Sequence, residues 1–545
     1  MEWKVLWPRD RLGGIVIQSL ELVLDLDRAY DETAQRQAAA DLLNCDVAHI
    51  HAVRVRKRSL DARGQIRLRL QCDVWQDEDA PDEPAPQQKY FPVRGDKRVI
   101  IIGCGPAGMF AALRLIELGI KPIILERGKD VQARRRDLAR INREGIVNPD
   151  SNYCFGEGGA GTYSDGKLYT RVKDKAAIAK VLQTLVAHGA STDILVDAHP
   201  HIGSNNLPKI VAALRETIRN AGGEVHFETR VENFLIEDNR LRAVVSSDGR
   251  EFSGDSFVLA AGHSGREIFE ILTRRGVRLE AKPFAMGVRI EHPQPLIDFI
   301  QYRHAPPVPP EFSGREWRHP NLPAASYRLA HTVHGRGVFS FCMCPGGWIV
   351  PSATQSGEVV VNGMSLSRRD SPFANSGIVV SIDLEDLAPY EKFGELAGLD
   401  LQRELEKTAF AVGGNIGDIG QIAPAQRVTD FLADRLSATL PASSYQPGLH
   451  SAPLHEVLPA HFAQRLQEGL RHFGQSMHGY VTEEGIIVGV ESRTSSPVRV
   501  PRDKSTFEHP QINGLFPCGE GAGYAGGIIS AAIDGARVAA ACVQK

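Results

Sequence analysis

A glycine-rich turn near the end of the first fifth of the chain constrains the fold more than any other feature. It reads Gly103-Cys104-Gly105-Pro106-Ala107-Gly108 and lies between an apolar run, residues 99–102, and a helix-compatible stretch, residues 109–118. Strand, glycine turn and helix in this order are the setting of a dinucleotide-binding fingerprint. Gly103 allows the tight turn, Gly105 lets the backbone approach a pyrophosphate, and Gly108 lets helix and strand pack closely. We therefore predict a phosphate site at the N-terminus of this helix.

A second apolar run, residues 122–125, ends at Glu126 and Arg127. Glu126 lies about 20 residues beyond the glycine turn, where a carboxylate in this fold accepts hydrogen bonds from an adenosine ribose. The pattern predicts that an adenine dinucleotide binds here. The alternative is an ordinary strand-to-helix turn, with Glu126 merely at a strand end.

The turn alone does not separate FAD from NAD, because both present the same adenosine pyrophosphate. The C-terminal segment favours FAD. There, the apolar run 514–518 is followed by Gly519-Glu520 and by a glycine cluster ending in Gly526-Gly527-Ile528, which opens a predicted helix, residues 528–543. This resembles the C-terminal FAD motif of two-domain flavoenzymes, in which the acid holds the ribitol and the helix points its N-terminus at the flavin. A helix dipole aimed there would stabilise negative charge on a reduced ring.

Two further segments are candidates for the cofactor site. Residues 155–168 form a long loop of small residues that either is a flexible surface excursion or lines a phosphate or flavin edge with backbone N–H groups. Residues 257–262 resemble the strand and turn by which the chain of related flavoenzymes returns to the FAD domain. The alternative is an ordinary buried strand that ends at a glycine. The cofactor residues predicted from all these segments are Gly103, Gly105, Pro106, Ala107, Gly108, Glu126, Arg127, Gly158, Gly159, Gly161, Ser164, Asp165, Gly166, Lys167, Val231, Ala261, Gly262, Gly519, Glu520, Gly526, Gly527 and Ile528.

Composition indicates an intracellular enzyme of two or three domains. The chain has 545 residues and a net charge of -3, which gives no general attraction to nucleic acid or anionic membrane. It contains no apolar run of about 18 residues and starts without a signal-peptide core, so we expect a cytoplasmic location and no membrane partner. Its eight cysteines follow neither a disulfide framework nor a zinc-site spacing, so we expect no metal.

Changes in composition along the chain suggest domain boundaries. Residues 1–76 read as a small strand-helix-strand-strand domain, and the acidic, proline-rich residues 77–97 as a linker. We expect an α/β fold, in which residues 98–282 and 488–545 form a Rossmann-like FAD-binding domain. Residues 283–487 are predicted to be an inserted α+β cap or substrate domain. Only one dinucleotide fingerprint is present, so NADH or NADPH would have to reduce the flavin without a domain of its own.

Several motifs outside the cofactor segments also resemble one family. This is the family of largely uncharacterised bacterial FAD-dependent dehydrogenases with a small ferredoxin-like domain ahead of the flavin domain. The resemblance spans nearly the whole chain and implies a flavin oxidoreductase without supplying a substrate. The motifs that carry it are residues 57–63, 158–168, 262–266, 341–347, 362–365, 424–427 and 491–497, together with the C-terminal motif.

Candidate catalytic residues are Cys342, Cys344, Glu491 and Arg493. If residues 338–344 form a strand, Phe339, Phe341 and Met343 face one side, and the two thiols share a face of small residues that could border a flavin. One thiol would then be a nucleophile or a redox partner of the flavin. The alternative is that both cysteines are small buried apolar residues.

The pair Glu491 and Arg493 lies shortly before the last FAD strand, where the arginine could bind an acidic substrate and the glutamate could move a proton. The alternative is an internal ion pair that fixes a domain boundary. His263 and Arg427 are weaker candidates, for approaching the cofactor and for binding an anion.

Two function classes remain. In the first, the protein is an FAD-dependent oxidoreductase that moves hydride between flavin N5 and an unidentified small organic molecule. In the second, it senses or acts on a macromolecule, RNA or protein, through the small domain, where Arg54, Arg56 and Arg58 would line one strand face. A second basic cluster is Arg134-Arg135-Arg136. No aromatic RNA-binding signature accompanies either cluster, so we expect a small-molecule partner rather than nucleic acid.

Overall fold

The computed structural model describes residues 11–12, 15–303 and 318–544. A five-stranded parallel sheet in the order β23-β11-β5-β6-β7 lies at its centre. Strands β5 (Arg98–Ile102) and β6 (Lys121–Leu125) are the apolar runs beside the glycine turn. Strand β11 (Ser256–Leu259) is the returning segment, β23 (Leu515–Pro517) belongs to the C-terminal motif, and β7 (Glu224–His226) completes the sheet. The predicted Rossmann-like arrangement is therefore confirmed.

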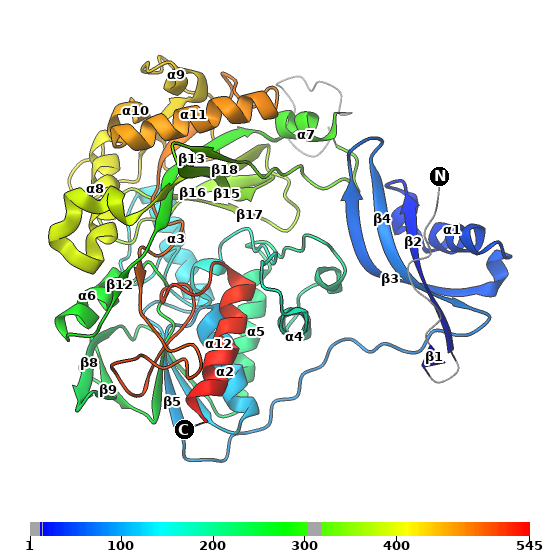
Figure 1. Ribbon diagram of the computed structural model, residues 1–545, viewed down its shortest axis with the longest axis horizontal. Coiled ribbons are helices and arrows are strands. Elements are labelled where there is room, and N and C mark those ends of the chain that lie inside the picture. The colour runs from blue at the N-terminus through cyan, green and yellow to red at the C-terminus, as the bar shows by residue number, and fades with distance from the viewer. Residues whose placement is uncertain (1–10, 13–14, 304–317, 545) are drawn as a thin grey trace.

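Helices α2 (Pro106–Glu117) and α12 (Ile528–Cys542) lie side by side on one face of this sheet, with α5 (Leu207–Asn220) next to α2 (Figure 1). The sheet is buried on both faces, as its apolar strands predict. Val99 and Ile101 of β5 pack under these helices, whereas Ile100 and Ile102 enter a second core on the opposite face.

The inserted region carries a seven-stranded, mostly antiparallel sheet in the order β14-β15-β18-β13-β21-β19-β20. Helices α8 (Ala397–Val412) and α11 (Ala460–Ser476) pack against it, and the mixed α+β character predicted for this region is confirmed. The strands are β13 (Phe284–Pro293), β14 (Ala330–Val333), β15 (Arg336–Cys344), β18 (Phe373–Ile382), β19 (Ala423–Arg427), β20 (Leu449–Ser451) and β21 (Ile486–Glu491).

Shorter elements surround these two sheets. The small sheets are β8 (Val231–Glu237), β9 (Arg240–Ser246) and β10 (Glu251–Ser253), then β12 (Glu280–Ala281) with β22 (Val498–Arg499), and β16 (Gly347–Pro351) with β17 (Val361–Ser365). The other α-helices are α3 (Val131–Glu144), α4 (Lys175–Ala187), α6 (Arg266–Arg274), α7 (Gln294–Tyr302), α9 (Val428–Leu432) and α10 (Leu454–Val457). The 3₁₀ helices are η1 (Arg28–Tyr30), η2 (Val47–His49), η3 (Gly159–Gly161), η4 (Thr192–Leu195) and η5 (Leu384–Leu396).

The small N-terminal region has the strand-helix-strand-strand order that the sequence predicts. It contains β1 (Arg11–Leu12), β2 (Ile15–Leu24), α1 (Glu32–Leu43), β3 (Ile50–Asp61) and β4 (Arg67–Gln76), with sheet order β1-β2-β4-β3. The Asp31 carboxylate starts α1 by accepting a hydrogen bond from the Thr33 amide, 3.0 Å away. Residues 15–76 supply one helix and three long strands, which are four of the six elements of a ferredoxin-like fold. The more detailed expectation of that fold therefore stays a prediction.

The basic strand face predicted in this region is occupied by acidic partners. Arg54 pairs with Glu83 of the linker, and Arg56 pairs with both Glu83 and Asp73. Arg58 instead joins the region to the FAD-binding part, where its side chain pairs with two aspartates and its backbone exchanges hydrogen bonds with residues 196 and 198. The linker runs beneath the molecule between the two parts (Figure 1). These arginines therefore serve intramolecular contacts.

None of the helices that the structure describes is long and apolar enough to cross a membrane. All eight cysteines are unpaired.

The contact between α2 and α12 requires a glycine. A Cβ on Gly535 would lie 2.0 Å from the carbonyl oxygen of Ala107, so Gly535→Ala must push the helices apart. We expect the free energy of unfolding to fall by about 2 kcal/mol, as in other overpacked cores, and the thermal transition to lie several degrees lower. Calorimetry of the FAD-loaded protein measures both. Gly64→Ala is the control, because a Cβ there meets nothing within 4 Å, and equal transitions for the two variants would contradict the packing.

Candidate cofactor and active site

A cavity of about 390 Å³ opens where β5, β6 and β11 end; we call it the strand-end cavity. Carboxyl ends of parallel strands are where open α/β sheets bind ligands. The predicted cofactor residues that line it are Gly103, Gly105, Pro106, Ala107, Glu126, Arg127, Gly159, Gly161, Ser164, Asp165, Gly166, Lys167, Val231, Ala261, Gly262, Glu520, Gly526, Gly527 and Ile528.

Three predicted cofactor glycines lie behind the lining. A Cβ on Gly108 would meet the carbonyl oxygen of Gly103 at 2.0 Å, and one on Gly158 would meet the Thr162 hydroxyl at the same distance. A Cβ on Gly519 would lie 2.9 Å from the Cβ of Ala107. These glycines shape the turns that face the cavity and have no direct access to it.

Two helices point uncapped N-termini at the strand-end cavity. The N-cap residues are Gly105 for α2 and Gly527 for α12, and neither helix has a side-chain cap. Their first N–H groups have no partner within the helix and carry its positive dipole end. A Cβ on Gly526 or Gly527 would meet nothing within 4 Å, so the backbone itself forms this wall. Backbone N–H groups that have no partner within their helix can donate hydrogen bonds to the anionic pyrophosphate of a dinucleotide.

Glu126 lies at the predicted ribose position and ties three loops together. Its carboxylate is buried and accepts backbone hydrogen bonds from Cys104, Gly128 and Gly156, each 2.9 Å long. A carboxylate offers about four acceptor positions, so about one remains for a ribose hydroxyl. The contacts therefore allow the predicted role and add a structural one that the sequence did not reveal.

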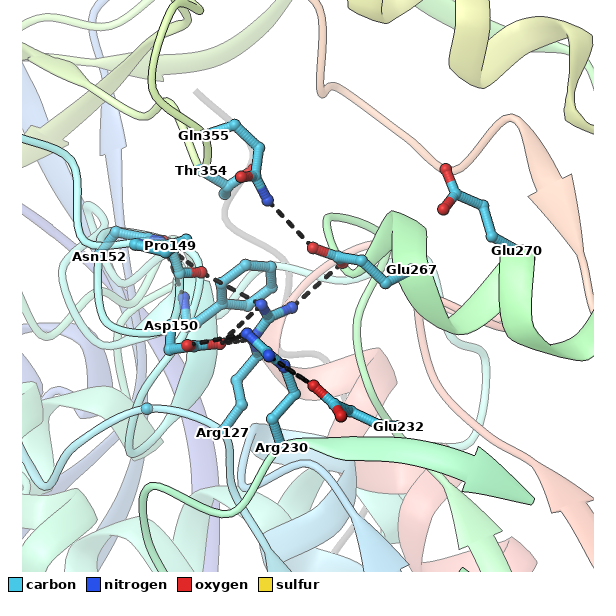
Figure 2. A network of polar contacts seen from close by, with 12 residues as sticks. Arg127, Pro149, Asp150, Asn152, Arg230, Glu232, Glu267, Glu270, Thr354 and Gln355 are labelled. Carbon is cyan, nitrogen blue, oxygen red and sulfur yellow. Dashed lines mark hydrogen bonds and ion pairs between the residues drawn. The ribbon is translucent and has the colours of Figure 1, made fainter. Parts of the chain in front are cut away.

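The wall of the cavity beside Glu126 is a network of charged side chains (Figure 2). Asp150 accepts hydrogen bonds from Arg127 and Arg230, and Arg127 also pairs with Glu267 of α6 at 3.2 Å. Gln355, from the inserted region, donates to the other oxygen of Glu267 at 3.0 Å. Arg230 and Glu267 line the cavity, and no motif in the sequence marks them, because Arg230 stands alone just before β8 and Glu267 stands alone on α6.

Arg134 fixes the glycine loop from within the protein. It was placed in a basic cluster on sequence grounds, but it is fully buried, which corrects that interpretation. Its guanidinium donates to backbone carbonyls of the loop at 2.8–3.0 Å, namely those of Asn152, Tyr153, Glu157 and Gly159. Burial lowers the pKa of Arg134, yet a guanidinium remains charged. A Cβ on Gly156 would meet the Arg134 side chain at 2.6 Å, which explains one glycine of the loop.

The inserted region also contributes to the wall of the cavity. Phe341, Cys342 and Asn362 of this region line the cavity, as do Lys167 and Glu520. Strand β15 does not keep the alternation expected for residues 338–344, because its pairing with β18 shifts between residues 341 and 344, and Cys342 has a left-handed φ of 46°. This bulge moves Met343 into the same core as Val338 and turns Cys342 toward the cavity. The expectation that Met343 and Val338 face opposite sides is therefore wrong.

The two thiols also differ in chemistry. Cys344 lies behind the cavity wall, and its thiol donates to the carbonyl oxygen of Cys342 at 3.3 Å. The neighbouring Cys344 thiol holds the pKa of Cys342 well below its ordinary value, and the charges of Lys167 and Arg289 act in the same direction. The neighbouring Cys342 thiol and burial raise the pKa of Cys344. Cys342 is therefore favoured as the thiolate.

Glu491 lies in the second sheet, outside the cavity lining, paired with buried Arg289 at 2.5 Å. Arg289 also donates to the carbonyl oxygen of Cys342 at 2.6 Å and to the side chain of Asn375 at 2.8 Å. Burial raises the pKa of Glu491 to about 7. Glu491 therefore contacts the cavity only through Arg289 and the bulge.

Arg493 lines the cavity, but acidic neighbours already hold it. It pairs with Glu406 at 2.7 Å and Glu358 at 3.1 Å, and Arg266 of α6 pairs with the same two carboxylates. Burial raises the pKa of Glu358 to about 7, while Arg266 and Arg493 lower that of Glu406. These contacts favour the internal ion pair over binding of an acidic substrate, because a substrate would have to displace a carboxylate.

The two weaker candidates, His263 and Arg427, differ in whether they line the cavity. His263 lines the cavity, with Nε2 2.8 Å from the carbonyl oxygen of Arg493 and Nδ1 3.9 Å from Glu520. Arg427 lies outside the cavity lining and donates to backbone carbonyls of Thr439 and Glu483.

Comparison with known proteins identifies the family. A family model described as an FAD binding domain matches residues 96–255, and one described as the C-terminal domain of an FAD-dependent protein matches residues 283–494. A domain of unknown function matches residues 16–75. An uncharacterized protein of Clostridium beijerinckii (strain ATCC 51743 / NCIMB 8052) is 43% identical over 452 residues, 82% of this chain and 81% of that protein. The chain belongs to this family of FAD-dependent proteins.

The predicted cofactor, FAD, and the class of FAD-dependent oxidoreductases are thereby confirmed. Similar solved structures include glycine oxidase from Geobacillus kaustophilus, 13% identical over 82% of this chain and 95% of that one, with a TM-score of 0.34. Another is CtdE in complex with FAD and a substrate, 11% identical over 82% and 80% of the two chains, with a TM-score of 0.32. Likenesses this low carry no argument about substrate or reaction.

The role of Arg134 can be tested by Arg134→Met, which keeps much of the volume and removes every donor. Four backbone carbonyls then lose a donor, and those of Asn152 and Tyr153 keep no other donor that the structure describes. We therefore expect the free energy of unfolding to fall by about 3 kcal/mol or more and FAD to be released. Urea unfolding and the flavin absorbance retained after gel filtration measure the two effects. The neighbouring Arg136 is exposed, and Arg136→Met should change stability by less than about 0.5 kcal/mol. Equal behaviour of the two variants would refute the role.

Proposed function

We propose that the protein moves hydride between its FAD and a small organic molecule that reaches the strand-end cavity at its Lys167 end. FAD, when bound, supplies the hydride-accepting or hydride-donating atom, N5 of its ring. The orientation is supported by the glycine turn and Glu126 at one end of the cavity, since these are the parts of the fingerprint that hold pyrophosphate and ribose. The reacting end then lies among Lys167, Cys342 and Asn362.

The single observation that carries this proposal is that the inserted region and the FAD-binding part line the cavity together. Phe341, Cys342 and Asn362 come from two strands of that region, whereas the rest of the lining belongs mainly to the FAD-binding part. Ligand sites between domains bury their ligand and exclude water. A purely structural cofactor would not require a thiolate and a lysine in this lining.

The residues at this end have complementary tasks. Lys167 presents an ammonium group that would hold an acidic or carbonyl oxygen of the substrate. The Cys342 sulfur would take the proton that an alcohol or amine loses as its hydride departs. Arg289 and Glu491 position Cys342 through its carbonyl oxygen. The alternative function, recruitment of RNA or protein through a basic face, loses its main support because Arg54, Arg56 and Arg58 are paired within the chain.

The protonation state of Cys342 gives one test. Its pKa is lowered, so the sulfur should be charged at neutral pH, and alkylation by iodoacetamide should slow only as the solution becomes acidic. In Cys344→Ala the thiol that donates to Cys342 is gone, so the midpoint of the pH profile should move upward. Mass spectrometry of the peptide carrying residue 342 reports the rate. An alkaline midpoint in the unchanged protein, or no shift in the variant, would contradict the assignment.

The reaction itself can be tested by anaerobic stopped-flow absorbance of the flavin. NADH, NADPH and a panel of small hydroxy and amino acids are offered separately, and we expect at least one to bleach the flavin at a rate that saturates with concentration. Lys167→Met should slow that reduction by about tenfold or more while FAD content stays the same. If dithionite reduces the flavin and no member of the panel does, hydride exchange with such molecules is excluded.

A further inference from the structure

A second, larger cavity of about 1420 Å³ adjoins the first; we call it the outer cavity. Three parts of the chain form it: the turn after β3, the loop around Lys167 and His199, and the inserted region at the ends of α7 and α11. Lys167 and Tyr169 line both cavities, so the two meet at these side chains. The outer cavity therefore lies next to the part of the strand-end cavity that Lys167 and Tyr169 line.

The lining of the outer cavity is cationic. It contains five arginines and lysines, namely Arg63, Lys167, Arg303, Arg328 and Arg369, together with three histidines. Among the described residues that line it, none is aspartate or glutamate. The whole chain has a net charge of -3, so this positive field is local. A recess lined by one sign of charge concentrates ligands of the opposite sign.

These cations differ in whether a carboxylate already holds them. Arg369 pairs with buried Asp165 at 2.5 Å, and Lys167 lies 3.8 Å from the same carboxylate. Arg63 pairs with Asp61. The side chains of Arg303 and Arg328 make no ion pair or hydrogen bond with any residue that the structure describes, and both are exposed. Two arginines with free donors are suited to a carboxylate, sulfonate or phosphate group.

The rest of the lining is apolar and aromatic. Tyr169 is 57% exposed and Phe299 44% exposed, which is high for such large side chains. Ile300 and Leu329 add aliphatic surface beside them. An exposed apolar area next to free cations matches a ligand that has an apolar body and an acid group.

We propose that the outer cavity admits the substrate and selects an organic anion with an aromatic or aliphatic body, whose acid group Arg303 and Arg328 hold. This inference rests on the proposed function for its link to the flavin. The volume exceeds the roughly 300–1,000 Å³ of common ligand pockets, so the body can be a ring system rather than a two- or three-carbon acid. Lys167 and Tyr169 then lie between the anchored acid group and the reacting end.

The test compares two probes of nearly the same shape, 8-anilinonaphthalene-1-sulfonate and the uncharged N-phenyl-1-naphthylamine. Each is titrated into FAD-loaded protein and its fluorescence followed. The anion should bind at least about tenfold more tightly than the neutral probe. In Arg303→Gln combined with Arg328→Gln, affinity for the anion should fall by about tenfold or more, with that for the neutral probe unchanged. Arg471→Gln, an exposed arginine outside the lining, should change neither.

Equal affinity for the two probes, no binding, or a sulfonate affinity that the double substitution leaves intact would overturn the proposal. The flavin spectrum confirms that each variant is folded and loaded. Binding is measured without turnover, so a protein that binds the anion selectively but exchanges no hydride would refute the proposed function alone. Flavin reduction by an organic donor without selectivity for the anion would refute the inference alone.

Discussion

The close contact between α2 and α12 is the constraint on which the rest of the site depends. These helices come from the glycine turn and from the end of the chain, and they touch at Gly535 and Ala107, where no Cβ fits. Side by side, they direct two uncapped N-termini at one cavity. Hydrogen-bond donors from both therefore converge on the place where an anionic dinucleotide binds.

Buried charges hold the loops around this cavity. Glu126 accepts from three backbone amides, and Arg134 donates to four backbone carbonyls, so one buried anion and one buried cation organise loops that have no regular structure. Two further arginines, Arg266 and Arg493, join the FAD-binding part to the inserted region by pairing with Glu358 and Glu406. Buried charges require such complete pairing. Residues that look catalytic in the sequence can thus be structural.

The sequence predicted the features that depend on neighbouring residues. Strand, turn and helix around Gly103 are local, and so is the strand-helix-strand-strand order of the N-terminal region. It could not predict that Arg134 is buried while Arg136 is exposed, because that depends on which side of α3 meets the loop 152–159. It also missed the bulge at Cys342, which arises from the register between β15 and β18. The outer cavity could not be predicted from the sequence, because it forms where three segments that are distant in the sequence meet.

In the proposed mode of binding, the flavin end of the cofactor faces Lys167 and Cys342, where the strand-end cavity meets the outer cavity. A crystal structure of the FAD-loaded protein tests this directly. We expect adenosine beside Glu126, the pyrophosphate at the N-terminus of α2, and the ring between Cys342 and the N-terminus of α12, with one edge open toward Tyr169. A reversed cofactor, or a ring enclosed away from Lys167 and Tyr169, would contradict it.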